Sequence, residues 1–139
     1  MSTRQIRLRV DGVEAVAKLR DDLSPRMAEA FWQTLPVETS ISHAMWTGSA
    51  CYYYPGEGPF TEVEELEYPV CSIYPGFVVA RPRGSEVMFS YGPTEYRWNI
   101  GTDYLTPIAQ ITDNREAFLG VLARMHDEGD KSISIERAG

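Results

Sequence analysis

The chain has 139 residues, 43% hydrophobic and 24% charged, and carries a formal net charge of −7. This length and composition predict a single domain over residues 1–139 with one hydrophobic core. The acidic balance argues against a nucleic-acid partner, because phosphate binding needs clustered lysine and arginine side chains.

The N-terminal sequence MSTRQIRLRVDG lacks the apolar segment that a signal peptide needs, and no stretch of the chain is apolar enough to span a membrane. We therefore expect a cytoplasmic protein with no membrane partner. Cys51 and Cys71 are too few for a disulfide framework, and each lies in an apolar run, so we expect buried, reduced thiols. A disulfide between them is the alternative, and it requires their two strands to be neighbours.

Residues 5–19 alternate apolar and polar side chains on either side of Asp11-Gly12. Asp-Gly between two alternating runs predicts a β-hairpin, because a type I′ turn needs positive φ at both central residues. Residues 24–36 predict a helix: Ser24-Pro25 supplies an N-cap and a first-turn proline, apolar residues recur every four positions, and Pro36 ends it.

From Thr39 to Tyr54 the apolar period returns to two, and Gly48 interrupts it, which predicts two strands joined at that glycine. The prolines, glycines and glutamates of residues 55–66 predict an acidic surface loop. Residues 113–116 resemble a capping box, which predicts a second helix that ends at Gly129. The other predicted strands are short and lie at 70–74, 77–80, 86–91, 105–111 and 132–135.

The order of these elements predicts the fold class. A chain of many short strands, with one helix after the second strand and one before the last, predicts a mainly β fold. We expect a closed barrel of about eight strands, since closure removes the exposed edges that so many strands would leave.

Four phrases of the sequence, in this order and spacing, resemble a family of small prokaryotic proteins with a cyclophilin-like barrel and no established function. The phrases are LSPRMAEAFWQTLP (23–36), HAMWTG (43–48), EYPVCSIYPG (67–76) and FSYG (89–92). The resemblance covers residues 5–112 and implies a cyclophilin-like barrel for this chain. Ser49 stands where family members often have glutamate, and Tyr68 where they often have asparagine.

The cyclophilin-like fold by itself does not imply peptidyl-prolyl isomerase activity. True cyclophilins carry a catalytic arginine and a Phe-x-x-Gln-Gly-Gly phrase around the proline-binding groove, and neither is found in this sequence. The resemblance therefore argues against prolyl isomerisation.

The candidate ligand-binding residues come from the part of the chain that carries the family phrases: His43, Trp46, Tyr53, Glu67 and Tyr91. Our leading hypothesis is that the protein binds an unidentified small molecule in a pocket on the barrel. His43 and Glu67 would hold a polar group of the ligand, and the three rings would pack on its apolar part. Because His43 and Trp46 are three residues apart, they line one pocket only if the strand twists or bulges.

Two other functions stay open. The first is a small hydrolase or isomerase in which His43 is the general base and Glu67 orients it. The second is a homo-oligomer that buries exposed rings at an interface. For His43 itself, a hydrogen-bonded position on the barrel wall is the alternative to a binding role, and His126 is expected to complement the dipole at a helix C-terminus.

The sequence predicts no metal site and no cofactor. Three or four converging ligands would be needed, and the candidate set His43, Cys51, Glu67 and Cys71 has no spacing signature. The glycines of residues 56–59 lack the flanking strand and helix of a phosphate-binding loop.

Overall fold

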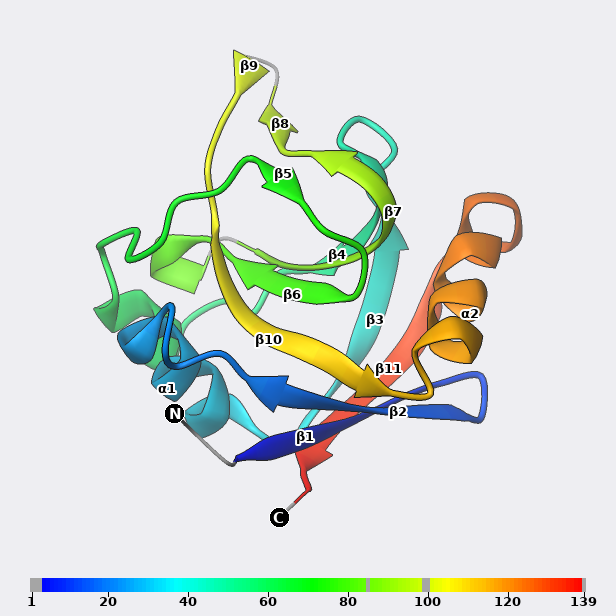
Figure 1. Ribbon diagram of the computed structural model, residues 1–139, viewed down its shortest axis with the longest axis horizontal. Helices are drawn as coiled ribbons and strands as arrows, with labels where there is room; N and C mark the ends of the chain where they lie inside the picture. The colour runs from blue at the N-terminus through cyan, green and yellow to red at the C-terminus, as the bar shows by residue number, and fades with distance from the viewer. Residues whose placement is uncertain (1–3, 85, 99–100, 139) are drawn as a thin grey trace.

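In a computed structural model, which describes residues 4–84, 86–98 and 101–138, one antiparallel sheet closes on itself as a barrel (Figure 1). Within these residues the barrel order is β4-β3-β11-β1-β2-β10-β6-β7, and pairing of β4 with β7 completes the ring. The strands are β1 (Gln5–Val10), β2 (Val13–Leu19), β3 (Val37–His43), β4 (Gly48–Tyr53), β6 (Phe77–Ala80), β7 (Val87–Glu95), β10 (Thr106–Asp113) and β11 (Lys131–Arg137). The predicted mainly β fold with a closed barrel of eight strands is confirmed.

Three short strands lie outside the ring. β5 (Ser72–Ile73) pairs with the far end of β7, and β8 (Arg97–Trp98) pairs with β9 (Gly101–Thr102) in a small ribbon. The strand predicted at 70–74 is therefore shorter than expected.

Two α-helices lie on opposite sides of the barrel (Figure 1). α1 (Pro25–Thr34) follows β2 and α2 (Arg115–Glu128) precedes β11, as predicted. α2 packs against β2, β3, β4 and β7, and α1 packs against β10 and a 3-10 turn, η1 (Pro59–Glu62). A second 3-10 turn, η2 (Pro82–Gly84), follows β6. No helix in the described part of the chain is long and apolar enough to cross a membrane.

The β1–β2 hairpin has the predicted turn. Asp11 and Gly12 have φ values of 52° and 76°, the positive values that a type I′ turn requires. Val10 and Val13 are paired directly beside the turn, and alternate residues of both strands are buried in the barrel.

The predicted capping box at 113–116 is wrong. Asn114 is the N-cap of α2, with φ 55° in the left-handed region, and its side chain does not cap the helix. Its amide instead donates to the backbone oxygen of Glu14 on β2 at 2.7 Å. A tertiary contact with the hairpin therefore takes the place of the local cap.

The segment predicted as an acidic surface loop, residues 55–66, also contributes to the core. Phe60 of η1 is 1% exposed, and its ring packs 6.2 Å from that of Phe31 on α1. Val63 is buried beside it. The acidic side chains face solvent, but these two apolar residues close one end of the barrel.

Two apolar clusters follow from strand alternation on β4, β6 and β7. Cys51, Val78 and Phe89 face the barrel interior and join its main core. A second cluster outside the barrel contains their strand neighbours Ala50, Val79 and Met88, together with Ala44, Ile73, Tyr96 and Leu105. Ile73, Tyr96 and Leu105 join this cluster from chain outside the ring, where Val70 pairs with Leu105 and the N–H of Tyr96 donates to the backbone oxygen of Cys71.

Candidate functional site

His43 ends β3 on the strand face that it shares with the buried Ile41, and its ring is half-buried. Its Nε2 atom lies 2.6 Å from the hydroxyl of Tyr91 on β7. The ring of His126 on α2 packs edge-on against it, with centroids 5.2 Å apart. The structure therefore brings together two of the predicted site residues, His43 and Tyr91, and adds His126.

The protonation state of this pair follows from its surroundings. Burial, and next the charge of His126, lower the pKa of His43 below its ordinary 6.5, so the imidazole is neutral at pH 7. Burial raises the pKa of Tyr91, against the effect of a hydrogen bond with Ser49, so the phenol keeps its proton. The phenol can then donate to Nε2, which leaves the proton of the imidazole on Nδ1.

The Nδ1 atom of His43 is buried and has no hydrogen-bond partner in the described part of the chain.

Ser49, which contacts Tyr91, was not predicted as a site residue and stood out only as a departure from the family pattern. Strand alternation places it on the same face of β4 as Cys51, which was the available signal.

Trp46 is on the other surface of the barrel wall. β3 ends at His43, and Trp46 lies in the turn that leads to β4. Its half-exposed ring packs on Tyr52 at 5.5 Å, and Tyr52 packs on Tyr54 at 5.1 Å. These three rings form a ladder on the outer face, apart from the His43–Tyr91 pair.

Tyr53 belongs to the barrel interior. It is 5% exposed, and its ring stacks on Phe89 with centroids 6.1 Å apart. Its hydroxyl is buried without a partner among the described residues. Burial also raises the pKa of this phenol, so it stays protonated.

Glu67 performs a different task from the one predicted. Its carboxylate accepts hydrogen bonds from the backbone N–H groups of Arg26 and Met27, at 3.0 and 2.8 Å. These are first-turn donors of α1 that have no partner within the helix, and a carboxylate there also complements the helix dipole. Because His43 packs against α2 on the opposite side of the barrel, Glu67 does not orient it (Figure 1).

Neither cysteine is paired in a disulfide. Cys51 is buried, with its Sγ 3.6 Å from the sulfur of Met125 on α2, and burial raises its pKa to about 12. Cys71 is partly exposed rather than buried as expected. In the described residues, no group of three or more His, Cys, Asp and Glu side chains is placed to hold a metal ion.

A cavity of about 270 Å³ lies on the outer face of the barrel, where residues 66–76 cross β6 and β10. We call it the tyrosine pocket, and it is lined by Arg20, Leu23, Tyr68, Val70, Ser72, Ile73, Tyr74, Phe77, Val79 and Pro107. Ile73 and Val79 of the outer cluster are buried, whereas Tyr68 and Tyr74 are 48% and 76% exposed. The pocket thus combines a packed apolar base with two solvent-facing rings.

Arg20 is the one charged side chain among the lining residues that the structure describes. Its Nε and Nη2 atoms donate to Asp22 at 3.0 and 2.9 Å, and Nη1 donates to Gln110 at 2.8 Å. The guanidinium also lies 5.9 Å from the centre of the Phe77 ring. These contacts hold the cation in place while they use three of its five N–H donors.

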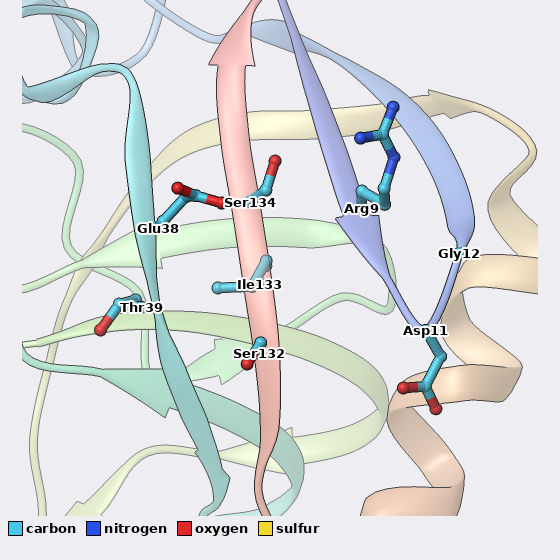
Figure 2. A pocket seen from close by; sticks show the side chains of 8 residues that line it. All are labelled: Arg9, Asp11, Gly12, Glu38, Thr39, Ser132, Ile133 and Ser134. Carbon is cyan, nitrogen blue, oxygen red and sulfur yellow. The ribbon is translucent and has the colours of Figure 1, made fainter.

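A larger hollow of about 510 Å³ lies on the outer face of β1, β3 and β11. Figure 2 shows the short side chains of Ser132 and Ser134 on β11, with Glu38 on β3 to one side and Arg9 on β1 to the other. Two of its three charged groups are paired, Arg9 with Glu14 and Asp11 with Lys131. The hollow is a polar depression in the sheet surface, and we assign it no function.

Comparisons with known proteins agree with this architecture. Residues 6–69 match a family model described as a protein of unknown function, DUF3830. No curated protein matches the chain.

Two solved structures are similar in fold. The solution structure of the hypothetical protein AF2241 from Archaeoglobus fulgidus has 17% identity and a TM-score of 0.65, over 97% of this chain and 95% of that one. The structure of McbB in complex with tryptophan has 18% identity and a TM-score of 0.75, over 96% of this chain. This chain spans only 45% of the length of McbB. At these identities the likeness shows a shared fold alone.

Proposed function

We propose that the protein binds a small molecule in the tyrosine pocket, and that the ligand has a planar apolar body and a carboxylate. The observation that carries this proposal is that one cavity combines an aromatic, apolar wall with the guanidinium of Arg20. Ligand sites are typically concave and mostly apolar, with a few placed polar groups that orient the ligand.

The apolar part of the ligand is inferred from the lining. Tyr74 and Tyr68 leave much of their ring surface in water, and a planar ligand between them would cover it. Phe77 and Val79 would provide the base against which the ligand packs. A cavity of about 270 Å³ suits a molecule the size of a single amino acid or one aromatic ring system.

The polar part of the ligand is inferred from Arg20. A guanidinium with unused N–H donors favours a carboxylate, and charge-assisted hydrogen bonds are the strongest available. The side chain of Tyr68 lines the same cavity as Arg20, so both groups can contact one ligand. Because Asp22 and Gln110 hold the guanidinium, little side-chain entropy remains to be lost on binding.

McbB, whose barrel has a similar fold, was solved in complex with tryptophan. This supports tryptophan as the first probe for the present chain. Indole-3-acetate is the second probe, because it keeps the ring and carboxylate and lacks the ammonium group.

The experiment is an isothermal titration of the full chain with both probes, compared between Tyr74→Ala and Tyr54→Ala. These are two exposed tyrosines, one in the tyrosine pocket and one in the outer ladder, so Tyr54→Ala is the matched control. We expect saturable binding that weakens about fivefold or more in Tyr74→Ala and is unchanged in Tyr54→Ala. Equal affinities in the two variants would overturn the site, and no saturable binding by either probe would overturn the ligand class.

A second pair of measurements tests the carboxylate. Indole-3-acetamide replaces the carboxylate of indole-3-acetate by a neutral amide. We expect the wild type to bind indole-3-acetate roughly tenfold more tightly than indole-3-acetamide. We expect Arg20→Gln to bind the two compounds with equal affinity. A preference that survives in Arg20→Gln would rule out the guanidinium as the anchor.

The His43–Tyr91 pair supports a second candidate, a small hydrolase or isomerase. The specific observation is a neutral imidazole whose Nε2 is held by a phenol at 2.6 Å and whose Nδ1 is unpartnered among the described residues. In such a pair the phenol can accept a proton from a substrate while it passes its own proton to Nε2, and the imidazole then carries the positive charge until the proton is returned. An ester and ketone substrate panel tests it: turnover that disappears in His43→Gln supports this candidate, and equal turnover in wild type and variant rejects it.

A further inference from the structure

The barrel wall has a free strand edge on β3. This strand pairs with β11 over residues 37–41, but it pairs with β4 only at Ser42 and His43. The two strands then separate, and a cavity of about 500 Å³ lies between β3 and residues 53–59. We call it the gap cavity. Residues 37–41 of β3 therefore have a neighbouring strand on one side only.

The register with β4 gives the direction of each backbone group on β3. In antiparallel pairing, the N–H and C=O of one residue point to the same neighbouring strand, and successive residues alternate between the two neighbours. The N–H of Ala44 donates to the backbone oxygen of Ala50 at 2.8 Å, so Ala44 points to the β4 side. Ser40 and Glu38 are four and six residues earlier on the same strand. Their N–H and C=O groups therefore also point to the β4 side, where the gap cavity lies.

The register with β11 gives the same result. The N–H of Ala138 donates to the backbone oxygen of Gln5 at 2.9 Å, in register with the pairing of β1 and β11. Even-numbered residues of β11 therefore point to β1, and odd-numbered ones point to β3. These odd-numbered residues are the ones opposite Thr39 and Ile41, which use their N–H and C=O groups on β11.

Glu38 and Ser40 thus direct four backbone groups at the gap cavity. Among the residues that the structure describes, no backbone group on that side is bonded to either of them. Both residues are exposed, so another chain can reach these groups. An unpaired strand edge is a template for a further strand, and extended peptides bind proteins in this way.

The charges around the edge indicate the sign of the added strand. Glu38 lies on the edge itself, Glu57 is a second exposed acid in the lining, and none of the described lining residues is basic. A second copy of β3 would bring the Glu38 side chains of two copies together, and like charges oppose such pairing. A lysine opposite Glu38 would instead form a cross-strand ion pair.

We propose that β3 is a docking edge for an extended, lysine-containing segment of a partner protein. The segment adds to the sheet as an antiparallel strand, and its backbone bonds to the N–H and C=O groups of Glu38 and Ser40. Its lysine lies opposite Glu38 on the outer face. This site shares no residue with the tyrosine pocket or with the His43–Tyr91 pair.

Hydrogen exchange of the full chain, followed by NMR, tests the free edge. We expect the amides of Glu38 and Ser40 to exchange at least about tenfold faster than those of Thr39 and Ile41, because only the second pair is bonded to β11. Equal protection of the four amides would show that the edge is already paired, and would overturn the proposal.

The probe for docking is the peptide Ac-Thr-Val-Lys-Val-Thr-NH2, titrated into the full chain. We expect saturable binding that slows exchange at the amides of Glu38 and Ser40 and leaves Thr39 and Ile41 unchanged. The same peptide with glutamate in place of lysine is the reference, and it should bind at least about threefold more weakly. The absence of saturable binding at millimolar lysine peptide would reject the docking edge.

Two N-methylated forms of the lysine peptide test strand addition itself. The N–H of a lysine opposite Glu38 points to β3, whereas the N–H of the valine that follows it points away. Nα-methylation of the lysine should therefore weaken binding about tenfold, and Nα-methylation of that valine less than about threefold. Equal losses would mean that side chains alone hold the peptide, which contradicts an added strand.

A matched pair of variants locates the lysine. Glu38→Lys and Glu65→Lys make the same charge change, the first on the edge and the second at an exposed acid outside the cavity. We expect Glu38→Lys to bind the glutamate peptide about threefold more tightly than the lysine peptide, and Glu65→Lys to keep the wild-type order. Equal effects of the two variants would reduce the binding to general attraction by a chain of net charge −7.

Light scattering of the chain without peptide distinguishes the other occupant of the edge. We expect a monomer at all concentrations used in the titrations. A dimer whose formation protects the amides of Glu38 and Ser40 would assign the edge to a second copy of this chain, and would overturn the proposed partner.

Discussion

Residues 51–54 and residues 68–74 have similar compositions but contribute to different parts of the molecule. Each holds one cysteine and at least two tyrosines. In the first run, on β4, Cys51 and Tyr53 are buried in the barrel while Tyr52 and Tyr54 lie on its outer face. In the second run, Tyr68 and Tyr74 line one hollow.

The difference arises because most of residues 51–54 lie on a regular strand, whereas most of residues 68–74 have irregular backbone. Successive side chains on a strand point to opposite faces, so the rings of a strand cannot all converge on one ligand. Between residues 66 and 76 the only strand is the two-residue β5, and this segment follows no period. Its rings can therefore turn to the same side, which is why we place the proposed pocket there and not at the denser run.

The largest expected contrast is in the reactivity of the two thiols, Cys51 in the first run and Cys71 in the second. Burial raises the pKa of Cys51 to about 12, so only about one molecule in ten thousand carries its thiolate at pH 8. We expect iodoacetamide to modify the native protein once, at Cys71, and to leave native Cys71→Ser unmodified over the same time. Mass spectrometry checks this, with urea-unfolded protein as the control in which both thiols react. Rapid labelling of native Cys71→Ser would contradict the buried position of Cys51.

The next contrast is in stability. Tyr53→Ala removes a ring that is stacked on Phe89 in the core, and we expect it to lower the free energy of unfolding by about 3 kcal/mol. Tyr74→Ala removes a ring that is 76% exposed and should change the free energy of unfolding by less than about 0.5 kcal/mol. Urea denaturation curves of the two variants measure both values. Equal losses would mean that Tyr74 packs against the barrel as Tyr53 does.

A smaller effect on stability is expected at Glu67, which directly precedes the second run and binds the N-terminus of α1. Glu67→Gln keeps the size of the side chain and removes the negative charge that accepts from Arg26 and Met27. We expect the free energy of unfolding to fall by about 1 kcal/mol and hydrogen exchange at those two amides to become faster. Glu65→Gln, whose exposed carboxylate lies 3.7 Å from Arg26, is the control and should leave the exchange rates unchanged.

The smallest expected effect is the pH dependence of stability contributed by His43. Because its pKa is lowered in the folded state, the unfolded chain binds more protons below the ordinary value of 6.5. Stability is therefore retained above pH 6.5 and falls as the pH is lowered through that value. His43→Gln should reduce this fall, and so should His126→Gln, because it removes a charge that lowers the pKa of His43. Urea titrations from pH 7.5 to pH 5 measure the slopes, and a wild-type slope equal to that of His43→Gln would reject the lowered pKa.

Much of the fold could be predicted because local patterns carry it. Asp11-Gly12 required a turn with positive φ, and the periods of two and of about 3.6 residues separated strands from helices. The site was predicted less well. Of the five candidate residues only His43 and Tyr91 come together. Trp46 lies on the outer face of the barrel, Tyr53 lies in its interior, and Glu67 caps the N-terminus of α1.

The sequence by itself therefore determined which side chains share a strand face, where the helices begin and end, and that the sheet closes as a barrel. Only the tertiary structure decided that Glu67 caps a helix 40 residues earlier in the chain and that Phe60 of an acidic segment is buried in the core. It also decided that Arg20, Tyr68 and Tyr74 line one cavity. The physical reason is that periodicity is a property of neighbouring residues, and contacts between distant segments depend on how the elements pack.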